Sequence, residues 1–192
     1  MLNFIVKLKF RSPIHFGYKE KTYQLSEITA SADTIFSAIC NSWRLLYGSK
    51  ELEEMLNAFV EGNPPFLISS LFPYYKDEFY LPKPVGVNFS KLVNDIKKAK
   101  KIKYLPINCL AGKIELGGYS NIKQGFVLKE DTEYIYFNQE IPRIVTDSIT
   151  SYTDIFYVQA VSFNREAGLY FFLTINNEAF LPKIKASIYV LG

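Results

Sequence analysis

The segment Ser12–Tyr47 constrains the fold most, because within it the apolar residues change from the period of a strand to the period of a helix. Before it, residues 3–10 alternate between apolar and polar side chains, which predicts a strand with one buried face. The order expected from this part of the chain is a strand, a polar turn, and a helix from Ser31 to Gly48. The helix is indicated by apolar residues at steps of three and four: Ile35, Phe36, Ile39, Cys40, Trp43, Leu46 and Tyr47.

The turn and the helix start form the first candidate site. The turn contains the one histidine of the chain, His15, and the helix start contains the hydroxyl side chains of Ser31, Thr34 and Ser37. Exposed N–H groups at a helix start attract anions, so this combination suggests an anion-binding face. There is also a structural interpretation: Ser31 is a good N-cap, worth about 1 kcal/mol, and Asp33 suits the first helical turn.

The rest of the chain predicts an α+β protein. We expect a ferredoxin-like (RRM-like) βαββα arrangement with a large insertion and without its last strand. The insertion is indicated by a weak hydrophobic pattern from Val85 to Gly125, and residues 155–163 and 169–175 are predicted to pair with each other as a hairpin. The other predicted elements are a helix from Ser49 to Gly62, strands at 66–72 and 78–81, and a terminal helix that begins near Pro182.

Length and composition narrow the class of protein. The chain has 192 residues, 48% of them hydrophobic and 16% aromatic, which excludes a disordered protein and fits one domain with an insertion. Cys40 and Cys109 lie far apart without C-x-x-C spacing, so we expect reduced thiols and a cytoplasmic protein. No apolar run approaches the roughly 18 residues of a membrane span, and we found no phosphate-loop, dinucleotide or zinc motif. We therefore expect no membrane contact, no cofactor and no metal.

The most basic segment has five lysines in seven positions: Lys97, Lys98, Lys100, Lys101 and Lys103. One interpretation is the solvated end of a helix. The other is contact with RNA phosphates, because each neutralised phosphate releases counterions. The net charge of the whole chain, +3, is too mild to decide between the two.

Two further functions stay open from the residues alone. His15 is a candidate acid–base residue for a metal-independent ribonuclease, with tyrosine or lysine as partner, although a lone histidine beside a turn more often packs or forms hydrogen bonds. The third hypothesis is a protein-interaction module. It is favoured if the His15 turn and the lysine-rich segment are buried against another protein.

Several short motifs, taken in their order along the chain, carry a resemblance to a known family. Together they resemble the fourth subunit of the Csm complex. This subunit belongs to the RAMP superfamily and caps the 5′ end of the crRNA in type III-A CRISPR effectors. The motifs are Ser12-Pro13-Ile14-His15-Phe16-Gly17, Ala32-Asp33-Thr34-Ile35-Phe36-Ser37-Ala38-Ile39, Phe66-Leu67-Ile68-Ser69-Ser70-Leu71-Phe72-Pro73, Leu81-Pro82-Lys83-Pro84 and Ala167-Gly168-Leu169-Tyr170-Phe171.

This resemblance implies a non-catalytic scaffold that binds the 5′ tag of the crRNA. Its implied protein partners are the large polymerase-like subunit and the backbone ribonuclease subunit. It further implies one N-terminal ferredoxin-like domain over residues 1–192, with an inserted lobe at 85–150 that carries a thumb hairpin, for which Phe126–Leu128 and Tyr134–Phe137 are the predicted strands. The expected RNA-binding residues are His15, Ser31, Thr34, Ser37 and Arg143, with looser phosphate contacts from Lys97, Lys98, Lys100 and Lys101 and base stacking on Tyr104 or Tyr119.

The chain departs from the family pattern in two respects. The family motif Pro-Arg-x-x-x-Asp-Arg-x-Thr corresponds here to Pro142–Thr150, where Ser148 replaces the second arginine. The family also continues past the position of Gly192 into a glycine-rich loop and a second ferredoxin-like domain, so we expect an N-terminal portion of a longer protein. A sheet without its last strand has an unpaired edge, which favours association.

Overall fold

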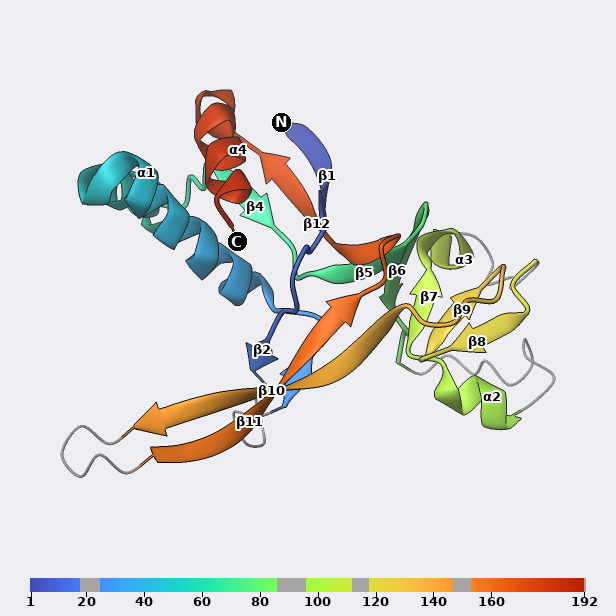
Figure 1. The fold of residues 1–192 in the computed structure, drawn as a ribbon. Coiled ribbons are helices and arrows are strands. Elements are labelled where there is room, and N and C mark those ends of the chain that lie inside the picture. Colours follow the sequence, from blue (N-terminus) through green and yellow to red (C-terminus); the bar gives the residue numbers. More distant parts are fainter. Residues whose placement is uncertain (18–24, 86–95, 112–117, 147–152, 192) are drawn as a thin grey trace. The chain divides into compact units, whose positions relative to one another are not determined.

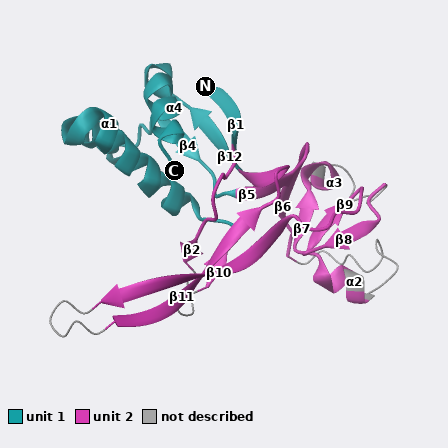
Figure 2. Cartoon of the chain, in the orientation of Figure 1, with its two compact units in different colours: residues 1–7, 29–71, 170–192 teal, residues 8–28, 72–169 magenta. Residues whose placement is uncertain are grey.

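The computed structural model describes residues 1–17, 25–85, 96–111, 118–146 and 153–191 (Figure 1). The chain divides into two compact units (Figure 2). Unit 1 contains Met1–Lys7, Thr29–Leu71 and Tyr170–Gly192, and unit 2 contains Leu8–Ile28 and Phe72–Leu169.

In unit 1, helices alternate with the strands of a small sheet. Within unit 1, β4 pairs antiparallel with β12, with Ile175 opposite Phe66, and β1 is also a neighbour of β12, which makes β12 the central strand of this unit (Figure 1). The predicted first strand and terminal helix are confirmed. In chain order the elements are β1 (Leu2–Leu8), α1 (Ala32–Val60), β4 (Phe66–Ile68), β12 (Ala167–Ile175), the 3-10 helix η2 (Glu178–Phe180) and α4 (Leu181–Tyr189).

Helix α1 begins and breaks where the sequence predicts. Ser31 is its N-cap, and its side chain accepts a hydrogen bond from the Thr34 N–H. Gly48 has φ 85° and ψ 171°, a backbone conformation that glycine adopts at little cost and that lies outside the helical region. The two predicted helices are therefore two segments of α1 on either side of Gly48.

Aromatic rings dominate the packing of unit 1. Trp43 on α1 is fully buried and stacks against Phe180, with the ring centroids 5.9 Å apart. Phe66 at the start of β4 is also fully buried and contacts Phe36 and Phe59 of α1, at centroid distances of 6.1 and 5.2 Å. These contacts hold both segments of α1 against the sheet, because fully burying such a side chain contributes roughly 1.5–3 kcal/mol.

In unit 2, short strands and two short helices accompany one long hairpin. Strands β5, β6, β7, β9 and β8 are neighbours in this order, and β10 pairs antiparallel with β11 (Figure 1). The elements are β2 (Phe16–Gly17), β3 (Ser26–Glu27), β5 (Phe72–Tyr75), β6 (Glu78–Pro82), α2 (Ile96–Lys101), β7 (Tyr104–Pro106), α3 (Ile107–Ala111), β8 (Asn121–Lys123), β9 (Phe126–Leu128), β10 (Tyr136–Thr146) and β11 (Thr153–Phe163).

The core of unit 2 is built around Phe126, which is fully buried. Its ring stacks on Tyr104 at 4.7 Å and meets Tyr80 edge-on at 5.2 Å. Gly168 is required by a close approach in the same unit, because a Cβ there would lie 2.4 Å from the Leu8 carbonyl oxygen. Any side chain at this position would force the backbone apart.

The predicted hairpin between residues 155–163 and 169–175 is wrong. Both segments are strands, but β11 pairs over its whole length with β10, from Tyr136 opposite Phe163 to Thr146 opposite Thr153. β12 pairs instead with β4, the strand that directly follows α1 in the chain. The predicted turn at Asn164–Gly168 suggested a local pairing. A period of two, however, indicates which face of a strand is buried and not which strand lies beside it.

The predicted thumb strands are corrected for the same reason. Phe126–Leu128 forms β9 and pairs with β8, whereas Tyr136 and Phe137 begin the long strand β10. The two segments therefore belong to different sheets. Ser148 and the end of the Pro142–Thr150 motif lie outside the described residues.

Cys40 and Cys109 are free thiols, half-buried and buried respectively. Burial raises the pKa of both thiols. Within the described part of the chain, no helix combines the length and the apolar character needed to cross a membrane.

Candidate nucleic-acid interface

His15 lies in unit 2, in a short segment beside β11. Ile14 exchanges two backbone hydrogen bonds with Val161, of 2.9 and 2.7 Å. The exposed His15 ring places Nδ1 2.7 Å from the Gln159 carbonyl oxygen. Because a carbonyl oxygen only accepts, Nδ1 carries the hydrogen, and Nε2 is the ring nitrogen that remains for a ligand.

The start of α1 lies in unit 1, and its polar groups largely satisfy one another. Ser31 Oγ accepts from the Thr34 N–H at 3.4 Å and lies 3.1 Å from Thr34 Oγ1. The Ala32 N–H donates to Ser70 Oγ at 3.2 Å. Ser37, one turn further on, is exposed. An anion at this helix start would compete with the cap for the same N–H groups.

The predicted face that combines His15 with this helix start is thus divided between two units. His15 belongs to unit 2, whereas Ser31, Thr34 and Ser37 belong to unit 1. Each group has its own local geometry: an exposed imidazole held by a backbone carbonyl, and a capped helix start with exposed hydroxyls on its first two turns.

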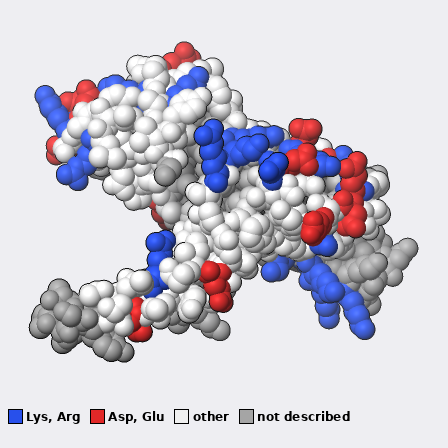
Figure 3. All heavy atoms as spheres, in the orientation of Figure 1, with Lys and Arg blue, Asp and Glu red and all other residues white. Residues whose placement is uncertain are grey.

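The lysine-rich segment forms helix α2 in unit 2. Ala99 and Ile102 are buried and pack with Leu105 and Val127. Lys97, Lys100 and Lys101 are exposed, and Figure 3 shows lysine and arginine side chains gathered at the position of this helix. The side chain of Lys98 lies outside the described ones. The helix therefore has one apolar anchor and one charged face.

Arg143 is exposed on β10, opposite Phe156 of β11. The neighbouring pair Ile144 and Ile155 is also exposed, by 68% and 58%, as is Tyr157. A two-stranded hairpin has no second layer to cover its faces, so this distal part of the hairpin presents a cation next to apolar side chains.

The root of the hairpin is held by two amide side chains that the sequence analysis missed. Gln124 Nε2 donates to the Tyr136 carbonyl at 2.5 Å, and its Oε1 accepts from the Ile135 N–H at 2.8 Å. Asn164 Nδ2 donates to the Tyr134 carbonyl at 3.1 Å. In the sequence, the signal for Gln124 is only that it precedes a glycine. In the structure Gln124 has φ 52°, which is rare for a residue with a side chain.

The tyrosines proposed for base stacking have internal partners instead. Tyr104 stacks on Phe126, and the Tyr119 hydroxyl donates to Glu78 Oε2 at 3.0 Å. Lys129 forms an ion pair with the same carboxylate, and its Nζ lies 5.0 Å from the centroid of the Tyr119 ring. Burial, and then the hydrogen bond to Glu78, raise the pKa of Tyr119. This arrangement argues against stacking of either ring on a base.

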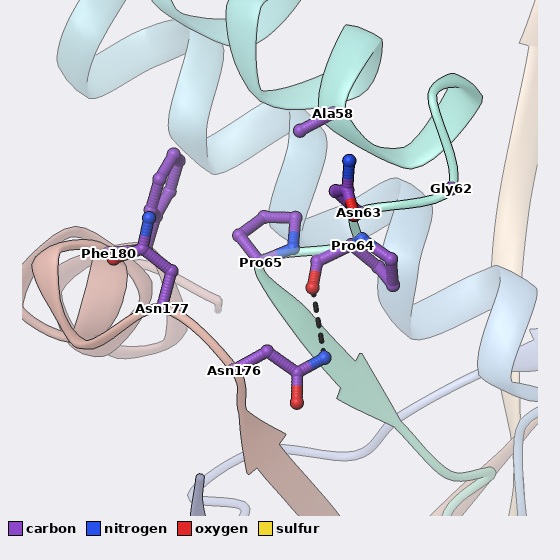
Figure 4. Close-up of a pocket in the computed structure, with 8 residues that line it drawn as sticks. All are labelled: Ala58, Gly62, Asn63, Pro64, Pro65, Asn176, Asn177 and Phe180. Atoms are coloured by element: carbon purple, nitrogen blue, oxygen red, sulfur yellow. Dashed lines mark hydrogen bonds between the residues drawn. The ribbon is translucent and has the colours of Figure 1, made fainter.

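A pocket of about 400 Å³ lies in unit 1, and none of the predicted site residues lines it. Its wall joins the end of α1 to the segment that follows β12, and Figure 4 shows the Asn176 amide donating to the Pro64 carbonyl, at 2.9 Å. The Asn177 side chain is used to cap η2. The lining residues are Ala58, Gly62, Asn63, Pro64, Pro65, Asn176, Asn177 and Phe180.

The described residues contain no group of three or more His, Cys, Asp or Glu side chains that could hold a metal ion. Three separate segments of unit 2 carry exposed predicted site residues: His15, Lys97, Lys100 and Lys101 of α2, and Arg143 of β10. What they offer chemically is hydrogen-bond donation and positive charge, which suits phosphate groups.

In sequence, the chain is similar to the CRISPR system Cms protein Csm4 of two archaea. The relative from Thermococcus onnurineus (strain NA1) is 30% identical over 172 residues, which cover 84% of this chain and 55% of the relative. The relative from Methanocaldococcus jannaschii is 24% identical over 230 residues, which cover 97% of this chain and 60% of the relative. No family model matches the chain.

In fold, the whole chain is similar to a chain in the crystal structure of a Csm1–Csm4 cassette in complex with cA4. The TM-score is 0.63 at 30% identity, and the match covers 66% of that chain. A chain in the crystal structure of a Csm3–Csm4 subcomplex of the type III-A CRISPR-Cas interference complex shares the fold, with a TM-score of 0.65 at 20% identity over 98% of this chain and 63% of that one.

The chain therefore spans less than two thirds of the length of each of these relatives. Within that span the similarity is continuous from the first strand to the last helix, since the matched structures cover 98–100% of the chain. In sequence and in fold, the chain is therefore similar to a part of the Csm4 proteins.

Proposed function

We propose that the chain is a non-catalytic RNA-binding subunit of a type III-A CRISPR effector complex and binds the 5′ tag of the crRNA. The observation that carries this proposal is the match over the whole chain, at 30% identity, to a chain of the Csm1–Csm4 cassette. A subunit of this kind needs exposed donors and cations for RNA and no catalytic constellation.

The proposed architecture is a ferredoxin-like RAMP domain with an inserted lobe at residues 85–150. The chain order β1, α1, β4, β12, α4, with β12 between β1 and β4, supports this reading. The proposed thumb is the hairpin β10–β11, because it is long and its distal residues Ile144, Ile155 and Tyr157 are exposed. Such side chains suit the apolar faces of bases at the end of a duplex.

The proposed tag-binding residues are His15, Ser31, Thr34, Ser37 and Arg143. His15 is exposed and its Nδ1 is bound to the Gln159 carbonyl, which leaves Nε2 for one hydrogen bond to RNA. Arg143 supplies a guanidinium that can bind a phosphate through two parallel hydrogen bonds. The hydroxyls of Thr34 and Ser37 are exposed and suit single hydrogen bonds to phosphate or to a 2′-hydroxyl.

We further propose two protein partners, the large polymerase-like subunit and the backbone ribonuclease subunit. The similar structures are described as Csm1–Csm4 and Csm3–Csm4 assemblies, so Csm1 and Csm3 are the candidates. The work of the subunit would then be to join the two in the cytoplasm while holding the guide.

The alternative is a metal-independent ribonuclease that uses His15. The observation that favours it is the exposure of His15 with a fixed Nδ1–H, which leaves Nε2 to act as a base. The two proposals predict different effects of His15→Ala. The nuclease would lose its RNA cleavage, whereas the scaffold has no cleavage to lose.

The test is a binding titration of labelled RNA with the assembled complex that contains this chain. RNA with the 5′ tag is compared with RNA of equal length and a scrambled tag, and cleavage is followed in the same samples. We expect tag-dependent binding without metal-independent cleavage. Arg143→Glu should weaken binding of tagged RNA by about tenfold or more, since the change removes one phosphate contact and adds repulsion.

Arg165→Glu is the matched control, because Arg165 is also an exposed arginine of unit 2 but lies in the turn after β11. Equal affinity for tagged and scrambled RNA would overturn the tag-binding proposal. Cleavage that disappears with His15→Ala would establish the nuclease instead. A wild-type complex that assembles but neither binds nor cleaves RNA would favour a protein-interaction module.

A further inference from the structure

The positive charge of the chain is concentrated in one segment of unit 2. Residues 96–129 contain eight lysines and one acidic residue, Glu115, which gives this segment a net charge of +7. The whole chain has a net charge of only +3, so the remainder is net acidic. A strongly basic patch on a chain that is otherwise acidic concentrates attraction for a polyanion at one place.

The structure sorts this segment into an apolar anchor and a charged face. Ala99 and Ile102 are 6% and 2% exposed, in a cluster with Leu105 and Val127. Lys97, Lys100 and Lys101 are exposed, and Figure 3 shows lysine and arginine side chains gathered at the position of α2. These three residues are called the α2 lysine face below.

The lysines of the α2 lysine face repel one another. Lys97 and Lys100, and Lys97 and Lys101, are three and four positions apart, so their like charges oppose the helix. Neither Lys100 nor Lys101 forms an ion pair with a described residue, whereas Lys129 in the same segment does. A helix of six residues has little stability of its own, so the burial of Ala99 and Ile102 maintains it against this repulsion.

Two aromatic rings of the lobe that could stack on bases already have partners within the protein. Tyr104 stacks on Phe126, and Tyr119 donates to Glu78, so both rings are occupied inside the protein. Lysine is a point charge on a flexible stem and does not impose the planar geometry that arginine does. What remains is attraction to phosphates, which carries no sequence information.

We propose that the α2 lysine face is a second RNA contact, which binds the phosphodiester backbone without regard to sequence and is separate from the residues that bind the tag. The inference rests on the proposed function, since it assumes that RNA passes this subunit. The shared chemistry of the ligand is a phosphodiester strand. Its source, guide or target RNA, is decided by the experiment.

The experiment uses the reconstituted complex with Lys97, Lys100 and Lys101 all changed to Gln. Gln keeps the helix propensity and leaves Ala99 and Ile102 in place. The control carries Arg44→Gln, Lys50→Gln and Lys185→Gln. These substitutions remove the same charge at exposed positions of unit 1. Two affinities are measured against salt concentration: guide RNA for the unloaded complex, and target RNA for the guide-loaded complex.

We expect the plot of log affinity against log salt to become less steep by about 2 in one of the two arms, because each lost phosphate contact contributes about 0.7–0.9 to the slope. Affinity at low salt should fall by about tenfold or more in that arm. The loss should be equal for tagged and scrambled guide, or for any complementary target. The affected arm identifies the strand.

Three results would overturn the inference: slopes that match the control in both arms, a loss confined to tagged guide, or failure of the lysine variant to assemble when the control assembles. The last result would assign the face to a protein contact. The tag-binding proposal is judged separately, by the difference between tagged and scrambled RNA, so either proposal can fail while the other stands.

Discussion

The start of α1 and the end of α2 both carry polar side chains, yet these side chains are used differently. At the start of α1, Ser31 and Ser70 bind the N–H groups of Thr34 and Ala32, so the side chains complete the helix. On α2, Lys100 and Lys101 point into solvent and form no ion pair with a described residue. The first arrangement stabilises the fold, whereas the second opposes it.

This difference separates residues that have a structural explanation from residues that need another one. Ser31 is accounted for by capping, which contributes about 1 kcal/mol, whatever else its hydroxyl binds. Lys100 and Lys101 form no ion pair with a described residue that would give them a comparable role. A ligand with negative charge would relieve their mutual repulsion, and this makes them the stronger candidates for binding.

The largest effect is expected at the anchor of α2. Ile102→Ala should lower the free energy of unfolding by about 2–4 kcal/mol, because Ile102 is 2% exposed and packs with Leu105 and Val127. Urea denaturation, with hydrogen exchange of β7 and β9, measures it. Ile144→Ala is the matched control, since Ile144 is 68% exposed and its truncation should change stability by less than about 0.5 kcal/mol. Equal losses in both variants would mean that α2 is not anchored as described.

The N-cap of α1 should give an intermediate effect. Ser31→Ala is expected to lower the free energy of unfolding by about 1 kcal/mol, because the Thr34 N–H loses its side-chain acceptor. Ser37→Ala, an exposed position further along the same helix, should be neutral or slightly stabilising, since alanine is the better helix former. Unchanged stability of Ser31→Ala together with weaker RNA binding would reverse the comparison, because Ser31 would then serve RNA more than the helix.

The smallest effect on stability is expected from the lysines of α2 themselves. The double change Lys100→Gln and Lys101→Gln should alter the free energy of unfolding by less than about 0.5 kcal/mol, with a stabilising sign, because it reduces repulsion with Lys97. Thermal unfolding at low and high salt measures this, and the gain should shrink as salt screens the charges. A clear destabilisation would show that these lysines support the fold after all.

The local features of this protein could be predicted from its sequence. The alternation in residues 3–10 predicted β1, the run of apolar positions from Ile35 predicted α1, and the hydroxyl of Ser31 predicted its cap. Gly48 was correctly placed at the break in α1. These features depend on contacts between residues at most four positions apart, so their causes lie within a short stretch of sequence.

Strand pairing could not be predicted in the same way. β11 and β12 both have apolar stretches and are joined by a short turn, which favours a hairpin between them, yet β11 pairs with β10 and β12 with β4. The same holds for Gln124 and Asn164, whose amides bind the backbone of residues 134–136. Such partners come into contact only when the chain brings distant segments together. The period of the hydrophobic residues does not indicate which segments these are.

The candidate site divides along the same line. The sequence by itself determined where the charges and hydroxyls lie along the chain, including the lysines of α2 and the single imidazole of His15. Only the tertiary structure decided which of these groups are already occupied: Ser31 by the helix start, Tyr104 and Tyr119 by the core, and His15 Nδ1 by the Gln159 carbonyl. The physical reason is that a polar group is available to a ligand only after the protein's own donors and acceptors have been satisfied.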